Sequence, residues 1–455
     1  MKRIPWIAGF TLIFSALLGA CDLITGSPPG AGTATPGSQG DVPSPGGGAQ
    51  TEVPGVGESS GPEAVPTDDP FKDLFFHQGW ARVPASITVF GGYGADEMTD
   101  VAAGGPGVVA VGYASRAGEL DAVVWYSSDG LRWARVEDAG IFGGQGVQYM
   151  KAVAAGARGV VAVGWEQGGD LDAAVWYSAD GMDWRRITSG SFGGAGDQGI
   201  NAVIANDSGF VAVGWEETTE EIRGAVWTSG NGVTWERVPH SEAAFGGLGS
   251  FVVLEAVTQV GSAVLATGSI ESVTEYDVDT GIWASNDGGK TWVRLNNSDQ
   301  VLGDSDSIRF QLVSGVTYGN SLFVMAGTEH NTPGSLSGDY VNGVIWTSLD
   351  GVNWQRVYDH KPEFYAQNML SVTASPFGFW VGGYEVVSDQ SQAAFWFSAD
   401  GITWEQVQYS ERVFGGNGLQ AVNGIVAAGP GLIAVGASHA TGDVDAAVWI
   451  YVPGR

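Results

Sequence analysis

The sequence predicts an all-β protein, a seven-bladed propeller built from four-stranded antiparallel blades. A tryptophan within "AVW" or a close variant recurs at spacings of 50 to 63 residues, at Trp125, Trp176, Trp227, Trp283, Trp346, Trp396 and Trp449. Each interval holds four short apolar runs, which is typical of a propeller blade. No stretch keeps a 3.6-residue apolar period, so we expect helices to be nearly absent. Seven markers predict seven blades.

The strands of one blade can be read from the second repeat. Its four runs are "MKAVAAG", "GVVAVGW", "DAAVWYS" and "DWRRI", which we name strands A to D. The last repeat stops at "AAVWIYVPGR", after its strand C, whereas the early segment "HQGWARV" matches strand D of the first repeat, "GLRWARV". We therefore predict that the segment around Trp80 completes the last blade and leaves no open edge.

The N-terminal region divides into two segments before the propeller. Residues 1–21 begin with "MKR", continue with an apolar run and end with "LGAC". This pattern resembles a bacterial lipoprotein signal, which implies lipidation of Cys21 and a place on the outer face of the cytoplasmic membrane or at the cell surface. An ordinary signal peptide with a chance cysteine is the alternative. Residues 22–70 contain nine of the 18 prolines and no aromatic residue, so we expect a disordered linker, followed by a propeller over 71–455.

A short turn between strands C and D is repeated through the chain. It reads "SSDGLRW" at Ser127 and "SNDGGKTW" at Ser285, with related versions at Ser178, Ser229, Ser348 and Ser398. The motif resembles the Asp box, or BNR repeat, of sialidase-type propellers. In such a turn the Asp accepts backbone N–H groups, the Gly adopts a positive φ and the Trp packs into the blade. We interpret these turns as structural, with a catalytic or calcium role as the alternative.

The opposite face of the propeller, which we call the upper face, holds the B–C and D–A loops. The B–C loops are rich in acidic residues and contain two arginines, Arg116 and Arg223, so we expect a negative surface that binds a partner. The candidate binding residues are Glu275, Asp277, Asp279, Asp304 and Asp306. Weak calcium candidates are the pairs Asp170/Asp172 and Asp443/Asp445, because calcium prefers several oxygen ligands. No other metal or cofactor is expected.

The A strands line the axis of a propeller, and their alignment predicts a polar ring there. The ring comprises Thr99, Lys151, Asn201, Glu255, Ser314, Ser371 and Asn423. Lys151 and Glu255 are its charged members and are candidate binding residues. A water-filled channel with a structural ion pair is the alternative.

The resemblance to sialidases implies an arginine cluster, a tyrosine–glutamate nucleophile pair and an aspartate acid. Six arginines recur in strand D, at the outer edge of the blades, and cannot form this cluster: Arg82, Arg135, Arg186, Arg237, Arg294 and Arg356. The remaining upper-face arginines are Arg116, Arg223, Arg309 and Arg412. Candidate nucleophiles are Tyr149, Tyr276 and Tyr365, with Glu97 or Glu255 nearby, and nothing singles one out.

The function expected from the sequence is a non-catalytic binding or scaffold module for a protein or glycan partner. A net charge of −30 disfavours nucleic acid, and the membrane is contacted only through the lipid. The alternatives are a glycoside hydrolase of sialidase-like type and a periplasmic assembly factor. We expect a monomer.

Overall fold

The structure, a computed structural model, describes residues 69–92, 94–105, 107–116, 118–246, 250–272, 277–295, 302, 310–330, 341–359, 366–387, 390–439 and 443–455. The signal segment with Cys21 and nearly all of the linker lie outside these residues. In the described part of the chain, no helix combines the length and apolar character needed to cross a membrane. The propeller is described here from Leu74 onward.

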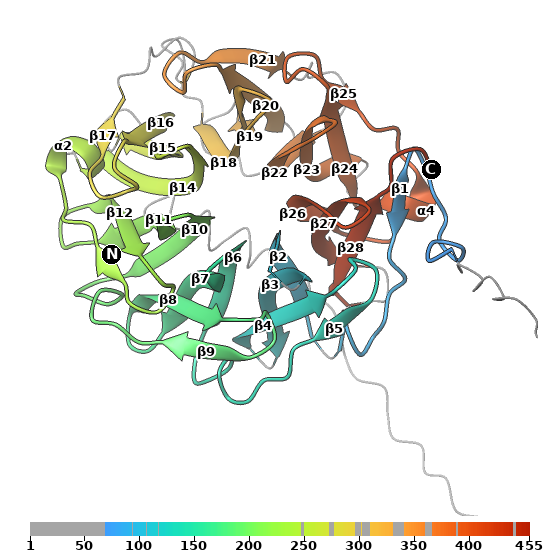
Figure 1. Ribbon diagram of the computed structural model, residues 1–455, viewed down its shortest axis with the longest axis horizontal. Helices are drawn as coiled ribbons and strands as arrows, with labels where there is room; N and C mark the ends of the chain where they lie inside the picture. Colours follow the sequence, from blue (N-terminus) through green and yellow to red (C-terminus); the bar gives the residue numbers. More distant parts are fainter. Residues whose placement is uncertain are drawn as a thin grey trace, which may run out of the picture. The chain divides into compact units, whose positions relative to one another are not determined.

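Seven four-stranded antiparallel blades form a ring, which confirms the predicted fold (Figure 1). Blades 1 to 4 are β2 (Asp96–Gly104), β3 (Gly107–Arg116), β4 (Glu119–Ser127), β5 (Trp133–Arg135); β6 (Gln148–Gly156), β7 (Gly159–Gln167), β8 (Leu171–Ser178), β9 (Trp184–Ile187); β10 (Gln198–Asn206), β11 (Gly209–Glu217), β12 (Ile222–Ser229), β13 (Glu236–Arg237); and β14 (Ser250–Val260), β15 (Ala263–Ser272), β16 (Asp277–Ser285), β17 (Val293–Arg294).

Blades 5 to 7 are β18 (Phe310–Gly319), β19 (Leu322–His330), β20 (Val341–Ser348), β21 (Gln355–Asp359); β22 (Ala366–Ser375), β23 (Gly378–Val387), β24 (Gln390–Ser398), β25 (Glu405–Gln406); and β26 (Gln420–Ala428), β27 (Gly431–Ser438), β28 (Asp445–Tyr451), β1 (Trp80–Arg82). One parallel bridge, Val278 to Phe310, links blades 4 and 5. Two single-turn helices, α2 (Glu242–Phe245) and α4 (Glu411–Phe414), lie in D–A loops.

The ring closes as predicted, because β1 forms the outer strand of the last blade. Trp80 pairs with Tyr451 and Arg82 with Trp449. Trp80 is fully buried and stacks on Phe395 of the neighbouring blade, with ring centroids 3.8 Å apart. The strand β1 therefore completes blade 7, and its Trp80 side chain packs into the interface between blades 6 and 7.

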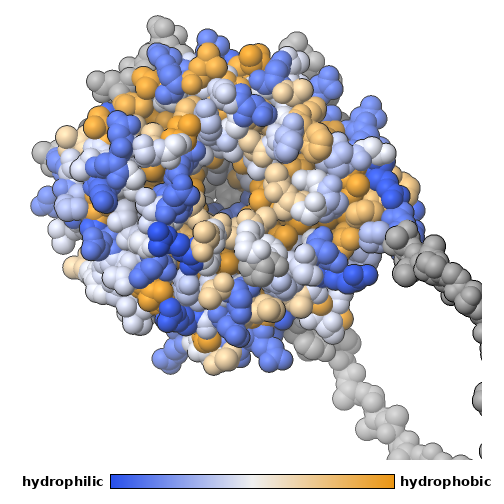
Figure 2. Space-filling model, viewed as in Figure 1, coloured by the Kyte–Doolittle hydropathy of each residue, from blue (hydrophilic) through white to orange (hydrophobic). Residues whose placement is uncertain are grey.

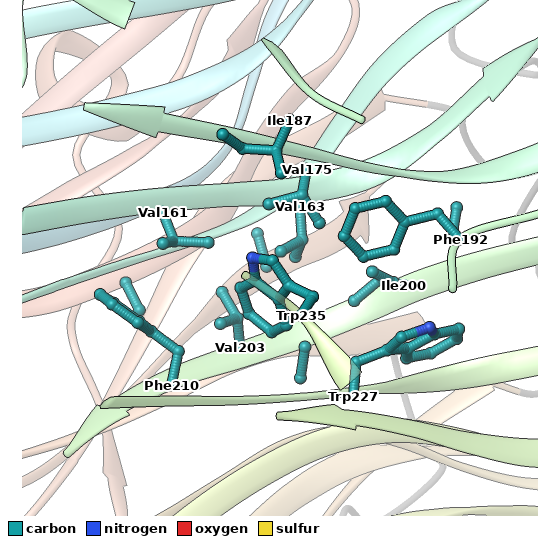
Figure 3. Packing of buried hydrophobic residues seen from close by; sticks show 14 of the residues in the cluster. Val161, Val163, Val175, Ile187, Phe192, Ile200, Val203, Phe210, Trp227 and Trp235 are labelled. Carbon is teal, nitrogen blue, oxygen red and sulfur yellow. The ribbon is translucent and has the colours of Figure 1, made fainter. Parts of the chain in front are cut away.

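The hydrophobic core lies between neighbouring blades. All seven marker tryptophans are fully buried. Between blades 2 and 3, Val163 and Val175 face Ile200, Trp227 and Trp235 (Figure 3). Because each blade covers the face of the next, the short alternating runs give a continuous core only when the ring is complete.

The repeated C–D turn has the same local geometry in each blade that carries it. In blade 2 the Asp180 carboxylate accepts the N–H groups of Met182 and Asp183 at 2.9 and 2.8 Å. Gly181 has a φ of +81°, and a Cβ there would lie 2.9 Å from Val109 of blade 1. The Trp184 indole donates to the Gly181 carbonyl at 3.0 Å. The turn therefore braces its own hairpin and contacts the preceding blade.

The "FGG" repeats of the D–A loops also serve packing. Five marker tryptophans donate their indole N–H to the carbonyl of the residue before the Phe, as Trp227 does to Ser191 at 2.7 Å. The glycine after the Phe makes room for an acidic side chain of strand C: a Cβ on Gly193 would lie 2.8 Å from the Asp172 carboxylate, and one on Gly91 would lie 2.2 Å from that of Asp445. A larger residue at either glycine would force the carboxylate to move.

Candidate functional site: the axial cavity

The innermost strand of every blade carries a β-bulge near the axis. The extra residues at these bulges are Thr99, Lys151, Asn201, Glu255, Ser314, Leu370 and Asn423. Six of them match the polar ring expected from the sequence. In blade 6 the extra residue is Leu370 and not Ser371, because the register breaks between Met369 and Ser371. A bulge adds one unpaired residue, and a sequence alignment does not reveal where it is added.

These bulges line a cavity of about 350 Å³ at the centre of the ring. Figure 2 shows the molecule hollowed at this point. Glu97 and Tyr149, each the second residue of its strand, also line the cavity, so it reaches toward the upper ends of the innermost strands. The lining mixes charged, amide and hydroxyl groups with aliphatic side chains.

Three of the polar bulge residues brace neighbouring blades. The Thr99 hydroxyl donates to the Met150 carbonyl of blade 2 at 2.7 Å. The Asn201 amide donates to the Leu254 carbonyl of blade 4 at 3.0 Å, and the Asn423 amide to the Met98 carbonyl of blade 1 at 2.9 Å. These three side chains have a structural role in holding the ring together.

Lys151 and Glu255 differ from these braces. Within the described part of the chain, no hydrogen bond or close ion pair engages the Lys151 ammonium or the Glu255 carboxylate. Burial raises the pKa of Glu255 to about 7, and the charge of Lys151 opposes that rise. Both residues are half-buried, and a charge partly removed from water without a hydrogen-bond partner is costly. Two such groups of opposite sign at one cavity form a candidate ligand site.

Two other carboxyl groups line the same cavity and already have partners. Glu97 accepts hydrogen bonds from the Tyr113 hydroxyl and from the Asn423 amide, both at 2.7 Å, while burial raises its pKa. Asp100 accepts the N–H groups of Val101 and Val153 at 2.8 and 2.9 Å. Burial raises the pKa of Asp100 to about 6, against these two hydrogen bonds. Glu97 therefore joins blade 1 to blade 7, and Asp100 joins blade 1 to blade 2.

Among the candidate nucleophiles, Tyr149 alone is described, since Tyr276 and Tyr365 lie outside the described residues. The Tyr149 ring stacks on Trp165 at 4.5 Å and on Tyr113 at 5.1 Å. The tyrosine that reaches Glu97 is Tyr113, on the second strand of blade 1. Sequence reasoning missed Tyr113 because it compared only the innermost strands.

Four of the six strand-D arginines pair with acids of their own blades, whereas Arg82 donates to the Gly415 carbonyl and the Gln420 side chain. Arg135 pairs with Asp96 at 2.8 Å, Arg186 with Glu166 at 3.1 Å, Arg237 with Glu216 and Arg356 with Glu329. Arg186 also lies over the marker tryptophan Trp176, 4.7 Å from the ring centroid. Glu166, Glu216 and Glu329 occupy the same position of strand B, whereas Asp96 lies on strand A of blade 1. An alignment of the B strands could have found this repeat.

The upper-face arginines do not form a cluster either. Arg116 lies 3.6 Å from Asp96, and Arg223 donates to Glu216 at 2.6 Å. Arg412 lies over the Phe75 ring at 4.2 Å, while Arg309 lies outside the described residues. Arg116 shares Asp96 with Arg135, and Arg223 shares Glu216 with Arg237, so each described arginine pair is already occupied by a carboxylate of its own blade.

The acidic candidates of the upper face fall into two groups. Glu275, Asp304 and Asp306 lie outside the described residues, as does the side chain of Asp277; Asp279 is half-buried on β16. Asp172 has a raised pKa, first because of burial and then because of the charges of Asp170 and Glu166. The three acids lie close together on blade 2. Calcium binding there stays a prediction.

The second calcium pair already has partners in the protein. Asp443 accepts the N–H groups of Gly94 and Val444 at 2.8 and 2.9 Å. Asp445 is buried against the "FGG" glycine Gly91. This pair thus helps join the last blade to the first.

One group of possible metal ligands was not apparent from sequence spacing. Glu221, His240 and Glu242 each offer a ligand atom, and these atoms lie within 4.8 Å of one another. We call them the rim cluster, because they come from the B–C and D–A loops of blade 3. In the described part of the chain, no other three His, Cys, Asp or Glu side chains meet this criterion.

No family model and no curated protein matches this sequence. Solved structures do match. A polysaccharide lyase, the PL25 ulvan lyase bound to -[GlcA(1-4)Rha3S]-, is 12% identical over 80% of this chain and 96% of its own, with a TM-score of 0.50. The likeness is one of fold.

Two further structures match less well. Trypanosoma rangeli sialidase with the inhibitor DANA is 13% identical over 70% of this chain and 59% of its own, with a TM-score of 0.45. An α-L-arabinofuranosidase from Fusarium graminearum is 13% identical over 64% of this chain and 89% of its own, with a TM-score of 0.43. Propeller lyases and glycoside hydrolases are therefore among the structural neighbours of this chain.

Proposed function

We propose that this chain is an envelope lipoprotein whose propeller is a binding module, and that its axial cavity takes a neutral or cationic polar group from a glycan or protein partner. The observation that carries this proposal is the pair Lys151 and Glu255. They are the two charged groups of the axial bulges, and neither has a partner in the described part of the chain. A ligand with a hydrogen-bond donor facing Glu255 and an acceptor facing Lys151 would give each charged group a partner.

The charges around the cavity support the choice of ligand. Lys151 is the basic residue among the lining side chains, which also include Glu97, Asp100 and Glu255. The described arginines that could offset these acids are paired elsewhere. An anionic sugar would meet net repulsion at this site, whereas an amine or a neutral hydroxyl-rich ligand would not.

The test is a binding screen of the full chain against neutral, amino and acidic glycans, with a pull-down from the native envelope. We expect Glu255→Gln and Lys151→Met each to weaken binding by about tenfold or more, because each removes a charged hydrogen bond. Asp183→Asn, an exposed change in a lower-face turn, is the matched control and should have no effect. Equal binding by all four proteins would contradict the axial site.

A glycoside hydrolase is the second candidate, and the raised pKa of Glu255 favours it. A carboxyl with a pKa of about 7 is protonated in about half of the molecules at neutral pH, and that protonated fraction can act as a general acid. The usual mechanism needs a second carboxylate, but Glu97 and Asp100 are engaged in hydrogen bonds within the fold. Release of sugar from chromogenic glycosides by the wild type, lost in Glu255→Gln, would establish the enzyme in place of the binding module.

A further inference from the structure

We propose that the rim cluster of Glu221, His240 and Glu242 binds a divalent transition-metal ion, with zinc the best fit. Imidazole nitrogen and carboxylate oxygen are both zinc ligands, and three protein ligands leave a fourth position for water or another ligand. The proposal is independent of the axial cavity. It concerns the upper rim of blade 3.

Two loops of fixed conformation bring the three side chains together. The Thr218 hydroxyl accepts the Glu221 N–H at 3.1 Å, and the Thr218 N–H donates to the Glu221 carbonyl at 2.8 Å. This closed turn places Glu221 directly before β12. On the other loop, the Ser241 carbonyl accepts the N–H groups of Ala244 and Phe245 at 3.0 and 2.8 Å. Both loops therefore hold their ligands before an ion arrives.

The distances are close to those that an ion requires. Ligand atoms around a tetrahedral zinc with bonds of about 2.1 Å lie about 3.4 Å apart. His240 Nε2 and Glu242 Oε2 are already 3.1 Å apart. The Glu221 carboxylate has to move by about an ångström, which a half-exposed side chain can do by a change of rotamer. His240 and Glu242 are 23% and 59% exposed, so an ion can enter from solvent.

The corresponding loop of blade 6 indicates that the fold does not require histidine here. That loop reads "YSERVF" where blade 3 has "HSEAAF". It forms the same single turn, with the Ser410 carbonyl accepting the N–H groups of Val413 and Phe414 at 3.0 and 2.8 Å. Tyr409 takes the place of His240, and its hydroxyl contacts Glu411. His240 makes the equivalent contact to Glu242 in blade 3, so the loop needs a polar ring at this position but not specifically a histidine.

The first test is calorimetric titration of the untagged full chain with zinc, compared with calcium and magnesium. We expect one zinc ion per chain and much weaker binding of calcium and magnesium, because imidazole is a poor ligand for those hard cations. His240→Tyr copies the natural arrangement of blade 6, so it should fold and should weaken zinc binding at least tenfold. Glu221→Gln should do the same. Glu220→Gln, an exposed neighbour outside the cluster, is the control.

Cobalt(II) gives a second readout, since its visible absorption reports the coordination that it adopts. We expect a d–d band in the wild type and in Glu220→Gln, but not in His240→Tyr. The site is refuted if no stoichiometric zinc binding occurs, or if His240→Tyr and Glu221→Gln bind zinc as the wild type does. Equal losses in all three variants would indicate diffuse binding by surface acids and would also refute it. Cys21 is present in every variant, so differences between them report the rim cluster.

Discussion

At the scale of single residues, what matters at the axis is whether a polar side chain has a partner inside the fold. Thr99 and Asn423 occupy the same bulge position as Lys151 and Glu255, but they donate to carbonyls of neighbouring blades. Their sequence position therefore does not reveal their role. Their hydrogen bonds to neighbouring blades distinguish Thr99 and Asn423, which have a structural role, from Lys151 and Glu255, which have no such bond among the described residues.

The raised pKa of Glu255 gives a pH-dependent prediction. Between pH 4.5 and about 7 the folded chain keeps a proton on Glu255 that the unfolded chain has lost, so the free energy of unfolding falls as pH rises through this window. Glu255→Gln removes this titration. We expect the melting temperature of the variant, relative to wild type, to be higher at pH 8 than at pH 5. One pKa unit corresponds to about 1.4 kcal/mol, so the gain is on the order of 1–3 kcal/mol, or several degrees.

Thermal unfolding of both proteins at pH 5 and pH 8 provides the measurement. Lys151→Met is the companion variant: it removes the positive charge that stabilises the Glu255 carboxylate, so it should lose stability at pH 8 more than at pH 5. Identical differences at the two pH values would contradict a buried, titrating Glu255.

At the scale of elements, the C–D turns and the D–A loops each combine one hydrogen-bonding group, one glycine and one aromatic ring. The Asp of the turn is held ionised by its bonds: a side-chain hydrogen bond from Thr291, followed by backbone N–H groups, lowers the pKa of Asp287 to about 2. In each of the six described turns the motif Asp or Asn accepts backbone N–H groups of its own turn, which supports the structural interpretation of these repeats.

The turn of blade 2 tests that interpretation. Asp180→Ala removes two backbone hydrogen bonds at an exposed position and should cost about 0.5–1.5 kcal/mol. Trp184→Ala removes a ring that is 6% exposed and should cost about 3–5 kcal/mol. Urea unfolding measures both. Both variants should keep the ligand binding of the wild type, and loss of binding by Asp180→Ala at an unchanged melting temperature would mean that the turns are functional.

At the scale of the whole molecule, the ring is a single packed unit because its last blade takes a strand from the N-terminal end. Beyond the paired residues, the Val83 N–H donates to Val448 at 2.9 Å and the Val452 N–H to Gly79 at 2.8 Å. The Arg82 guanidinium lies over Trp449 at 5.5 Å. The closure thus repeats the contacts that strand D makes in the other blades.

Trp80→Ala tests this closure. The change removes a fully buried indole that packs against Trp380 and Phe395 of blade 6, so it should cost about 3–5 kcal/mol and lower the cooperativity of unfolding. Ile87→Ala, at a side chain that is 71% exposed, is the control and should change the melting temperature little. An unchanged melting curve for Trp80→Ala would mean that β1 does not hold the ring closed.

The sequence by itself determined the architecture, because the blade repeats and each repeat carries its own strand pattern, turn and buried tryptophan. The same regularity predicted the seven blades and the pairing of β1 with the C-terminal strand, and six residues of the predicted polar ring are the bulge residues of the structure.

The tertiary structure alone showed which of the axial polar residues are hydrogen bonded within the fold. The hydrogen bonds of Thr99, Asn201 and Asn423 cross between blades, the Tyr113–Glu97 bond joins two strands, and the rim cluster joins loops about 20 residues apart. A bulge adds one residue, and in blade 6 that residue is Leu370, although Ser371 also lines the cavity. Contacts between side chains of different strands depend on register and curvature, and these exist only once the ring is closed.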